Sequence, residues 1–157
     1  MLPEEVAGKS AAIVGRLKLL LGQTELAAIH CFEPIPAWNE VRVIPLIDFL
    51  QAKYPQLLVY TSRKTGGLWR IVSLDDQVVQ GKPSLDCVVV PMLGFDPASL
   101  HRLGNGGGYY DQMLSEQPQA RKIGVCFELG NLTSLPIESH DIALNAIVTE
   151  QQTYQKT

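Results

Sequence analysis

Apolar residues in the first part of the chain recur at helical spacing. Val6, Ile13 and Leu17 lie seven and four residues apart, so they share one face of a helix. Pro3 suits the first turn, because no helical hydrogen bond needs the N–H group that proline lacks. The pattern predicts a helix over about residues 4 to 21.

A buried strand and a second helix are predicted next. Residues 27 to 32 form a short apolar run, which favours a buried strand, and prolines end it. Asn39 is the expected N-cap of the helix that follows. The apolar face of this helix holds Val43, Leu46, Ile47 and Leu50.

A β-hairpin is predicted after the second helix. Residues 57 to 61 and residues 68 to 74 read as its two strands, and a pair of glycines between them marks the turn. Arg63 and Lys64 would make the tip of this hairpin basic.

The run Cys-Val-Val-Val at residues 87 to 90 is the most continuous apolar segment. An unbroken run of this kind is typical of a strand buried on both faces, at the centre of a parallel sheet. A helix over about residues 107 to 115 and strands over 122 to 127 and 143 to 148 complete the pattern, with the last of these expected to end the sheet. The predicted fold is α/β, a three-layer α/β/α arrangement with a mostly parallel central sheet. Ligands of such sheets bind beyond the carboxyl ends of the strands.

Composition narrows the class of protein. With 157 residues, 46% of them hydrophobic, the chain is expected to form a single domain over residues 1 to 157. The formal net charge of -3 gives no electrostatic footprint for nucleic acid, and no apolar run reaches the length of a membrane span. The N-terminus lacks the features of a secretory signal, so we expect a cytoplasmic protein, and a monomer. The three cysteines follow no metal-binding or disulfide pattern and read as buried packing residues.

A glycine-rich loop between the central strand and a helix is the main candidate for chemistry. Four glycines fall within residues 104 to 108, where free backbone N–H groups at a helix start can bind phosphate oxygens. Arg102 adds a cation, Asp111 a carboxylate for a metal ion, and Tyr109 and Tyr110 a stacking face and hydroxyls. A glycine-rich loop alone is weak evidence, and an aspartate at a helix start also serves as a cap. Spacing alone therefore leaves phosphate binding open.

Three stretches together resemble the 5-formyltetrahydrofolate cyclo-ligase family, also called methenyltetrahydrofolate synthetases. They are Val-Pro-Met-Leu-Gly-Phe-Asp at residues 90 to 96, Arg-Leu-Gly at 102 to 104 and Gly-Gly-Gly-Tyr-Tyr-Asp at 106 to 111. A fainter likeness covers residues 9 to 150. The resemblance implies a reaction that uses ATP and Mg²⁺ and acts on a reduced folate. The formyl oxygen of 5-formyltetrahydrofolate takes the γ-phosphoryl group, N10 attacks the activated carbon, and phosphate leaves to give 5,10-methenyltetrahydrofolate.

The resemblance also implies roles for individual residues. Tyr110 and Arg102 would be catalytic, and Glu40, Tyr109 and Tyr110 would contact the folate. Mg²⁺ would be held by Asp111, with Asp141 as a second carboxylate. The implied ATP contacts are Arg102, Leu103, Gly104, Asn105, Gly106, Gly107, Gly108, Tyr109, Tyr110 and Asp111.

The chain departs from the family pattern at several positions. The family commonly has an aromatic or basic residue at the position of Asn105 and an arginine at the position of Gln112. It commonly has glutamate at the position of Lys82 and aspartate at the position of Asn145. The family's basic N-terminal helix, which contacts ATP, is expected to be missing.

The cations of that missing helix could be replaced by Lys9, Arg16 or Lys18, or these side chains could simply be solvated. Two other classes stay open: a non-catalytic nucleotide- or folate-binding paralogue, and a sugar-phosphate isomerase or acyl-transfer enzyme on a related sheet.

Overall fold

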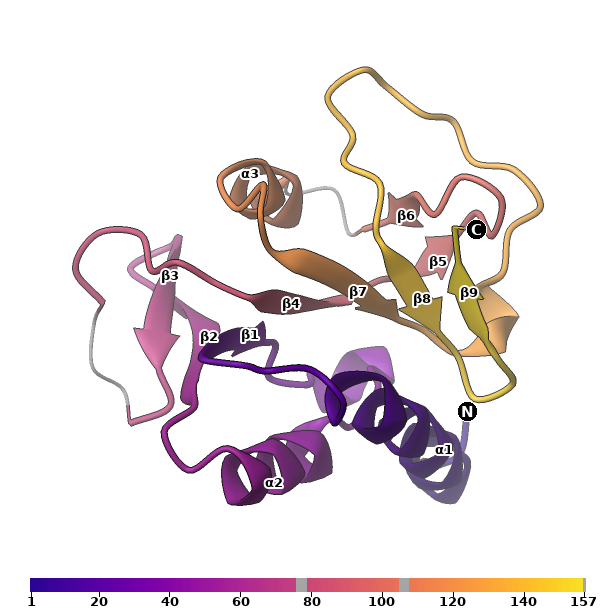
Figure 1. Cartoon of the computed structure of the whole chain (residues 1–157). Coiled ribbons are helices and arrows are strands. Elements are labelled where there is room, and N and C mark those ends of the chain that lie inside the picture. The colour runs from indigo at the N-terminus through magenta and orange to yellow at the C-terminus, as the bar shows by residue number, and fades with distance from the viewer. Residues whose placement is uncertain (76–78, 105–107, 157) are drawn as a thin grey trace.

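A mixed sheet with a parallel centre organises the chain. The computed structural model describes residues 1–75, 79–104 and 108–156. Within these residues seven strands form one sheet in the order β3-β2-β1-β4-β7-β8-β9 (Figure 1). The five inner strands are parallel, and β3 and β9 pair antiparallel at the edges. The strands are β1 (Ala28–Cys31), β2 (Leu58–Thr65), β3 (Leu68–Ser73), β4 (Cys87–Pro91), β7 (Arg121–Val125), β8 (Ala146–Val148) and β9 (Thr153–Gln155).

Helices cover both faces of this sheet. Helices α1 (Pro3–Leu21) and α2 (Ile44–Lys53) lie together on one face, and α3 (Tyr109–Ser115) lies on the other (Figure 1). The predicted three-layer α/β/α fold is therefore confirmed.

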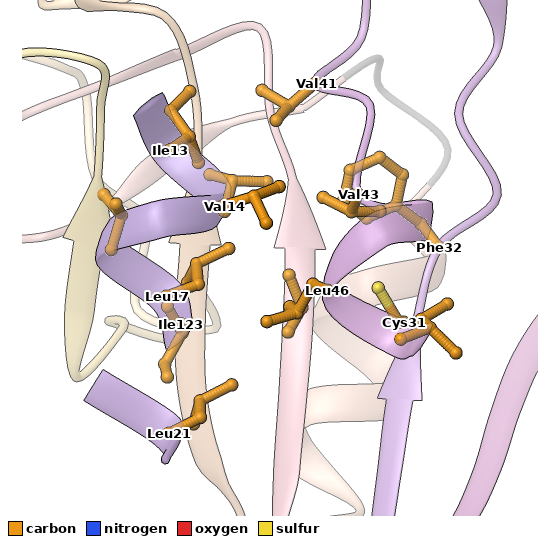
Figure 2. Close-up of a cluster of buried hydrophobic side chains, with 14 of the residues drawn as sticks. Ile13, Val14, Leu17, Leu21, Cys31, Phe32, Val41, Val43, Leu46 and Ile123 are labelled. Atoms are coloured by element: carbon orange, nitrogen blue, oxygen red, sulfur yellow. The ribbon is translucent and has the colours of Figure 1, made fainter. Parts of the chain in front are cut away.

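The central strand β4 explains why its sequence lacks polar residues. Cys87 and Val89 face the core under α1 and α2, whereas Val88 and Val90 face the core under α3, and all four side chains are fully buried. Figure 2 shows the first of these cores, where side chains of α1 and α2 meet those of the sheet. The prediction of a strand buried on both faces is confirmed. The three cysteines are buried and free, as expected.

Several short elements follow the carboxyl ends of the parallel strands. Strands β5 (Gly94–Phe95) and β6 (Arg102–Leu103) form a small antiparallel pair. Two single-turn helices, η1 (Pro36–Trp38) and η2 (Glu128–Gly130), follow β1 and β7. These elements bring irregular backbone, with its side chains, to the carboxyl ends of the parallel strands.

The structure corrects the expected role of Asn39. This residue is the C-cap of η1 with φ of 51°, a left-handed conformation that asparagine tolerates better than most residues, and it is not the N-cap of α2. Helix α2 starts later, with Val43 at its N-cap and a proline in its first turn. The sequence contained that proline signal, but Asn39 was the more obvious cap.

Three further expectations about elements were wrong in part. The described helix α3 begins at Tyr109, since Gly108 before it adopts φ of 69°. The strand expected over residues 143 to 148 is shorter and is not the last, because β9 pairs with it at the edge of the sheet. Strand β2 runs on to Thr65, so Arg63 and Lys64 lie within the hairpin strand rather than at its turn.

Candidate functional site

A cavity of about 760 Å³ opens at the carboxyl ends of the parallel strands. Phe32 and Glu33 follow β1, Met92 follows β4, and Cys126 follows β7, and all four residues line it. The chain passes from β1 to β2 on one side, whereas β4 pairs with β1 on its other side, so the strand order reverses between β1 and β4. Ligands of open α/β sheets bind at such a reversal. The cavity therefore lies where the sequence placed the candidate site.

Nine of the predicted site residues line this cavity. They are Glu40, Arg102, Leu103, Gly104, Gly108, Tyr109, Tyr110, Asp111 and Asp141. The remaining three, Asn105, Gly106 and Gly107, lie outside the described residues. Positions separated by about a hundred residues in sequence thus converge on one space.

Arg102 occupies the centre of this group. Its Nη2 lies 3.4 Å from Oδ1 of Asp111, and its guanidinium lies 5.5 Å from the ring centroid of Tyr110. The Arg102 side chain is 8% exposed, and its Nε has no hydrogen-bond partner among the described residues. A Cβ on Gly104 would come within 2.4 Å of Arg102 Nη1, so a side chain there would displace the guanidinium. The charge of Arg102 is therefore held in place beside the cavity, where it favours an anion.

Aromatic rings from α3 and β3 form one wall of the cavity. Trp69 stacks on Tyr109 with ring centroids 5.8 Å apart, and Tyr110 meets Tyr109 edge to face at 5.4 Å. Burial raises the pKa of the Tyr110 phenol, so this hydroxyl stays protonated. Tyr110 forms no side-chain hydrogen bond to the described residues, which leaves its hydroxyl available to a ligand.

Glu40 and Asp141 enter the cavity from two loops. Glu40 Oε2 accepts a hydrogen bond from the backbone N–H of Ile35 at 2.8 Å, and burial raises the pKa of the Glu40 carboxyl. Asp141 Oδ2 accepts a hydrogen bond from the backbone N–H of Glu138 at 2.8 Å. One oxygen of each carboxylate is thereby oriented by its own loop.

The carboxylates fit a magnesium ion only in part. No group of three or more His, Cys, Asp and Glu side chains able to hold a metal ion occurs in the described part of the chain. Mg²⁺ is commonly held by one or two carboxylates together with phosphate oxygens and water, so such a group is not required. Asp111 and Asp141 both line the cavity, and Asp111 is balanced by Arg102. These residues fit Mg²⁺ that arrives with a nucleotide.

Sequence reasoning missed the apolar part of the cavity. Trp38, Trp69 and Leu129 line it, with 49%, 44% and 82% of their surfaces exposed. Single exposed apolar side chains are common, but apolar side chains gathered in one groove are typical of a ligand site. The two tryptophans were visible in the sequence, but only the fold brings η1 and β3 to the same cavity.

The basic residues of α1 do not reach this cavity. Lys9 lies 3.8 Å from Glu150, Arg16 donates a hydrogen bond to the backbone oxygen of Gln151, and Lys18 lies over the ring of Phe49. All three contacts are on the α1 side of the molecule. Of the two alternatives for these residues, the structure does not support the one in which they supply a cation to the site.

Fold and site together define a class: an α/β protein with a cavity of charged and aromatic side chains at the switch point of its sheet. Residues 48–150 match the 5-formyltetrahydrofolate cyclo-ligase family. The chain belongs to this family, as the sequence resemblance predicted.

Individual relatives agree with this assignment. The 5-formyltetrahydrofolate cyclo-ligase of Escherichia coli (strain K12) is 32% identical over 84 residues, which are 52% of this chain and 46% of that protein. The enzyme of the same name from Saccharomyces cerevisiae is 34% identical over 70 residues, which are 41% of this chain and 33% of that protein. The matched region thus covers less than half of each of these relatives.

Solved structures share the fold over nearly the whole chain. A 5,10-methenyltetrahydrofolate synthetase from Mycoplasma pneumoniae superimposes with a TM-score of 0.81 at 23% identity, covering 96% of this chain and 90% of the other. The Aquifex aeolicus protein of the same name gives a TM-score of 0.77 at 23% identity, covering 99% and 84%. Within the described residues, no helix is both long enough and apolar enough to cross a membrane.

Proposed function

We propose that this protein cyclises 5-formyltetrahydrofolate to 5,10-methenyltetrahydrofolate with ATP, and so acts as a ligase of folate one-carbon metabolism. The observation that carries the proposal is the convergence on one cavity of nine residues to which the family resemblance gives a role, with Arg102 held between Asp111 and Tyr110. Membership of the cyclo-ligase family and the relatives of that name support it.

The polar side of the cavity suits phosphoryl transfer. This reaction needs in-line positioning and neutralisation of spreading charge more than covalent help from the protein. Arg102 would contact phosphate oxygens with its fork of donors, and backbone N–H groups of residues 104 to 108 would add to it. Asp111 and Asp141 would hold Mg²⁺, which supplies further positive charge beside the phosphates.

The aromatic side suits the folate. The formyl oxygen bonds to the γ-phosphorus of ATP as the bond between that phosphorus and ADP breaks. N10 then attacks the formyl carbon, and inorganic phosphate leaves. Trp69 and Tyr109 offer flat faces for the pteridine ring, and the Glu40 carboxylate offers an acceptor for its N–H groups. Tyr110 would donate a hydrogen bond to the formyl group.

The cellular setting forms part of the proposal. We infer a cytoplasmic monomer that binds ATP and a reduced folate and does not bind nucleic acid. The net charge of -3 supports the last point, because phosphate backbones are bound by basic surfaces.

One assay tests the proposal directly. The protein is mixed with 5-formyltetrahydrofolate, ATP and Mg²⁺, and the methenyl product is followed by its absorbance. Product formation that stops when ATP or Mg²⁺ is omitted is the expected result. If no product forms while calorimetry detects binding of ATP or folate, the chain is a binding paralogue and the proposal is wrong.

A further inference from the structure

Three hydrogen-bonded polar side chains connect the sheet to the cavity. His30 lies on β1 and Ser62 on β2. His30 pairs in register with Tyr60, two residues before Ser62, so the three side chains share one face of the sheet. This is the α3 face, because Tyr60 packs against the core under α3. His30 Nε2 lies 2.8 Å from Ser62 Oγ, which lies 2.5 Å from the hydroxyl of Tyr109. Ser62 and Tyr109 line the cavity, whereas His30 is fully buried. These hydrogen bonds thus link the interior of the sheet to the aromatic wall.

The protonation state of His30 sets the direction of these hydrogen bonds. Burial lowers the pKa of His30 to about 4, so the imidazole is neutral at neutral pH and carries one N–H. Its Nδ1 is buried and has no hydrogen-bond partner among the described residues. An orphaned buried N–H is rarer in proteins than an orphaned acceptor. The single proton therefore belongs on Nε2, which faces Ser62.

The proton on Nε2 decides which way each hydroxyl points. His30 donates to Ser62 Oγ, which leaves the Ser62 hydroxyl proton for a second partner. The Tyr109 oxygen is the other side-chain atom that Ser62 contacts among the described residues, and donation to it avoids an unpaired proton on the buried serine. The hydroxyl proton of Tyr109 is then left to point into the cavity. If the proton were on Nδ1 instead, the hydrogen bonds would run the other way. The Nδ1–H group would then be buried without a partner, and the Tyr109 hydroxyl could only accept a hydrogen bond from a ligand.

We propose that His30 and Ser62 are positioning residues that make the Tyr109 hydroxyl a hydrogen-bond donor to an acceptor oxygen of the ligand. Given the proposed function, on which this identification of the ligand rests, the oxygen belongs to the formyl group of the folate or to a phosphoryl group of ATP. The stacking of Tyr109 on Trp69 fixes the ring and leaves hydroxyl rotation as the remaining freedom, which Ser62 removes.

The tautomer of His30 tests the first half of the proposal without any ligand. In protein labelled with ¹⁵N, long-range ¹H–¹⁵N correlation distinguishes a protonated ring nitrogen from an unprotonated one, and the His30→Gln variant identifies the His30 signals. We expect the neutral form with the proton on Nε2 at pH 7. A proton on Nδ1 would overturn the proposal whether or not the protein is a cyclo-ligase.

Matched variants test the second half. Tyr109→Phe removes the donor, and Ser62→Ala removes the group that orients it. Each is expected to weaken binding of one ligand about tenfold in calorimetry, the equivalent of one hydrogen bond. Weaker binding of 5-formyltetrahydrofolate but not of tetrahydrofolate identifies the formyl oxygen, and weaker binding of ATP identifies a phosphoryl oxygen. Unchanged binding of all three ligands would overturn the proposal.

A pair of substitutions at His30 separates positioning from packing. The amide of His30→Gln can donate to Ser62 as the imidazole Nε2–H does, whereas His30→Leu cannot. We expect the glutamine variant to bind within about threefold of the unmodified protein and the leucine variant to match Ser62→Ala. Equal losses in both variants, with equal thermal stability, would contradict a directional role for His30.

Discussion

Arg102 illustrates how a single side chain can be held ready for an anion. Its charge is balanced by Asp111 and stacked on Tyr110, while its Nε has no partner among the residues that the structure describes. Lysine in its place would keep the charge but lose the planar fork and the stacking. At this scale the sequence was most informative, because the family motif named Arg102, Tyr110 and Asp111 before the fold placed them together.

Arg102→Lys should lower kcat/KM for ATP by about tenfold to a hundredfold, as expected for the loss of a bidentate, charge-assisted contact. Steady-state kinetics at saturating folate measure this change. Arg42→Lys is the matched control, because Arg42 is exposed and does not line the cavity. An equal effect in both variants would contradict the role given to Arg102.

Asp111→Asn should raise the Mg²⁺ concentration needed for half-maximal turnover by about tenfold or more, because the amide lacks the charge that a hard cation prefers. Among the described residues helix α3 has no side-chain cap hydrogen bond at its N-terminus, so any fall in melting temperature should be limited to the effect of weakening the ion pair with Arg102. Turnover at a series of Mg²⁺ concentrations and a thermal melt check the two statements. A lower melting temperature with unchanged Mg²⁺ dependence would make Asp111 a structural residue.

Other residues of the site were beyond the reach of sequence. His30 is a core residue, and its link through Ser62 to Tyr109 depends on the register between β1 and β2. Trp69 joins the cavity only because β3 pairs back onto β2. Contacts of this kind are set by strand pairing across long separations, and no local pattern encodes them.

At the scale of elements, periodicity predicted the interiors well and the ends less well. Helix α1 and the strand β4 were found because each has a strong, uninterrupted pattern. Strand β9 was missed because an edge strand of two half-buried residues and one exposed residue has no apolar run. The predicted N-cap at Asn39 was wrong because this residue ends η1, and residues 40 to 43 separate it from α2.

Strand β7 packs closely against the loops above it, and this packing gives a prediction about stability. A Cβ on Gly124 would come within 2.0 Å of Met92 Cε and 2.6 Å of Leu144 Cδ1. Gly124→Ala should therefore lower the free energy of unfolding by about 1 to 3 kcal/mol, which is the usual cost of overpacking a core. Chemical denaturation measures the loss.

A second glycine provides the control for this prediction. Gly15 lies exposed within α1, and an added Cβ there meets nothing within 4 Å. Gly15→Ala should raise stability by up to about 1 kcal/mol, because alanine favours a helix interior more than glycine does. A stabilising effect at Gly124 would show that Met92 and Leu144 can move aside without cost.

At the scale of the whole molecule, the buried histidine links stability to pH. The pKa of His30 falls from 6.5 in the unfolded chain to about 4 in the folded protein because the side chain is buried. The unfolded chain therefore binds a proton between pH 6.5 and about 4 that the folded protein does not bind. This contribution to stability is fully present above pH 6.5, is lost as pH falls toward 4, and amounts to about 3 kcal/mol.

Urea denaturation at pH 7.0 and pH 4.5 measures this linkage. The unmodified protein should lose more stability between these pH values than His30→Gln, whose side chain does not titrate. Comparing the two pH slopes removes the contribution of all other titrating groups that the variants share. Equal slopes would mean that His30 is protonated in the folded protein without penalty.

The reversal of strand order at the centre of the sheet also constrains how the chain folds. Ile29 of β1 pairs with Cys87 of β4, so the two strands that flank the switch point are separated by a helix and a hairpin in sequence. Closing such a long loop costs chain entropy before the contacts of β4 repay it. The N-terminal half can form α1, α2 and the hairpin early. The cavity is incomplete until β4 inserts beside β1 and β7 pairs with β4, because residues that follow these strands line it. Ligand affinity should therefore appear late in refolding, together with the last burial of apolar surface.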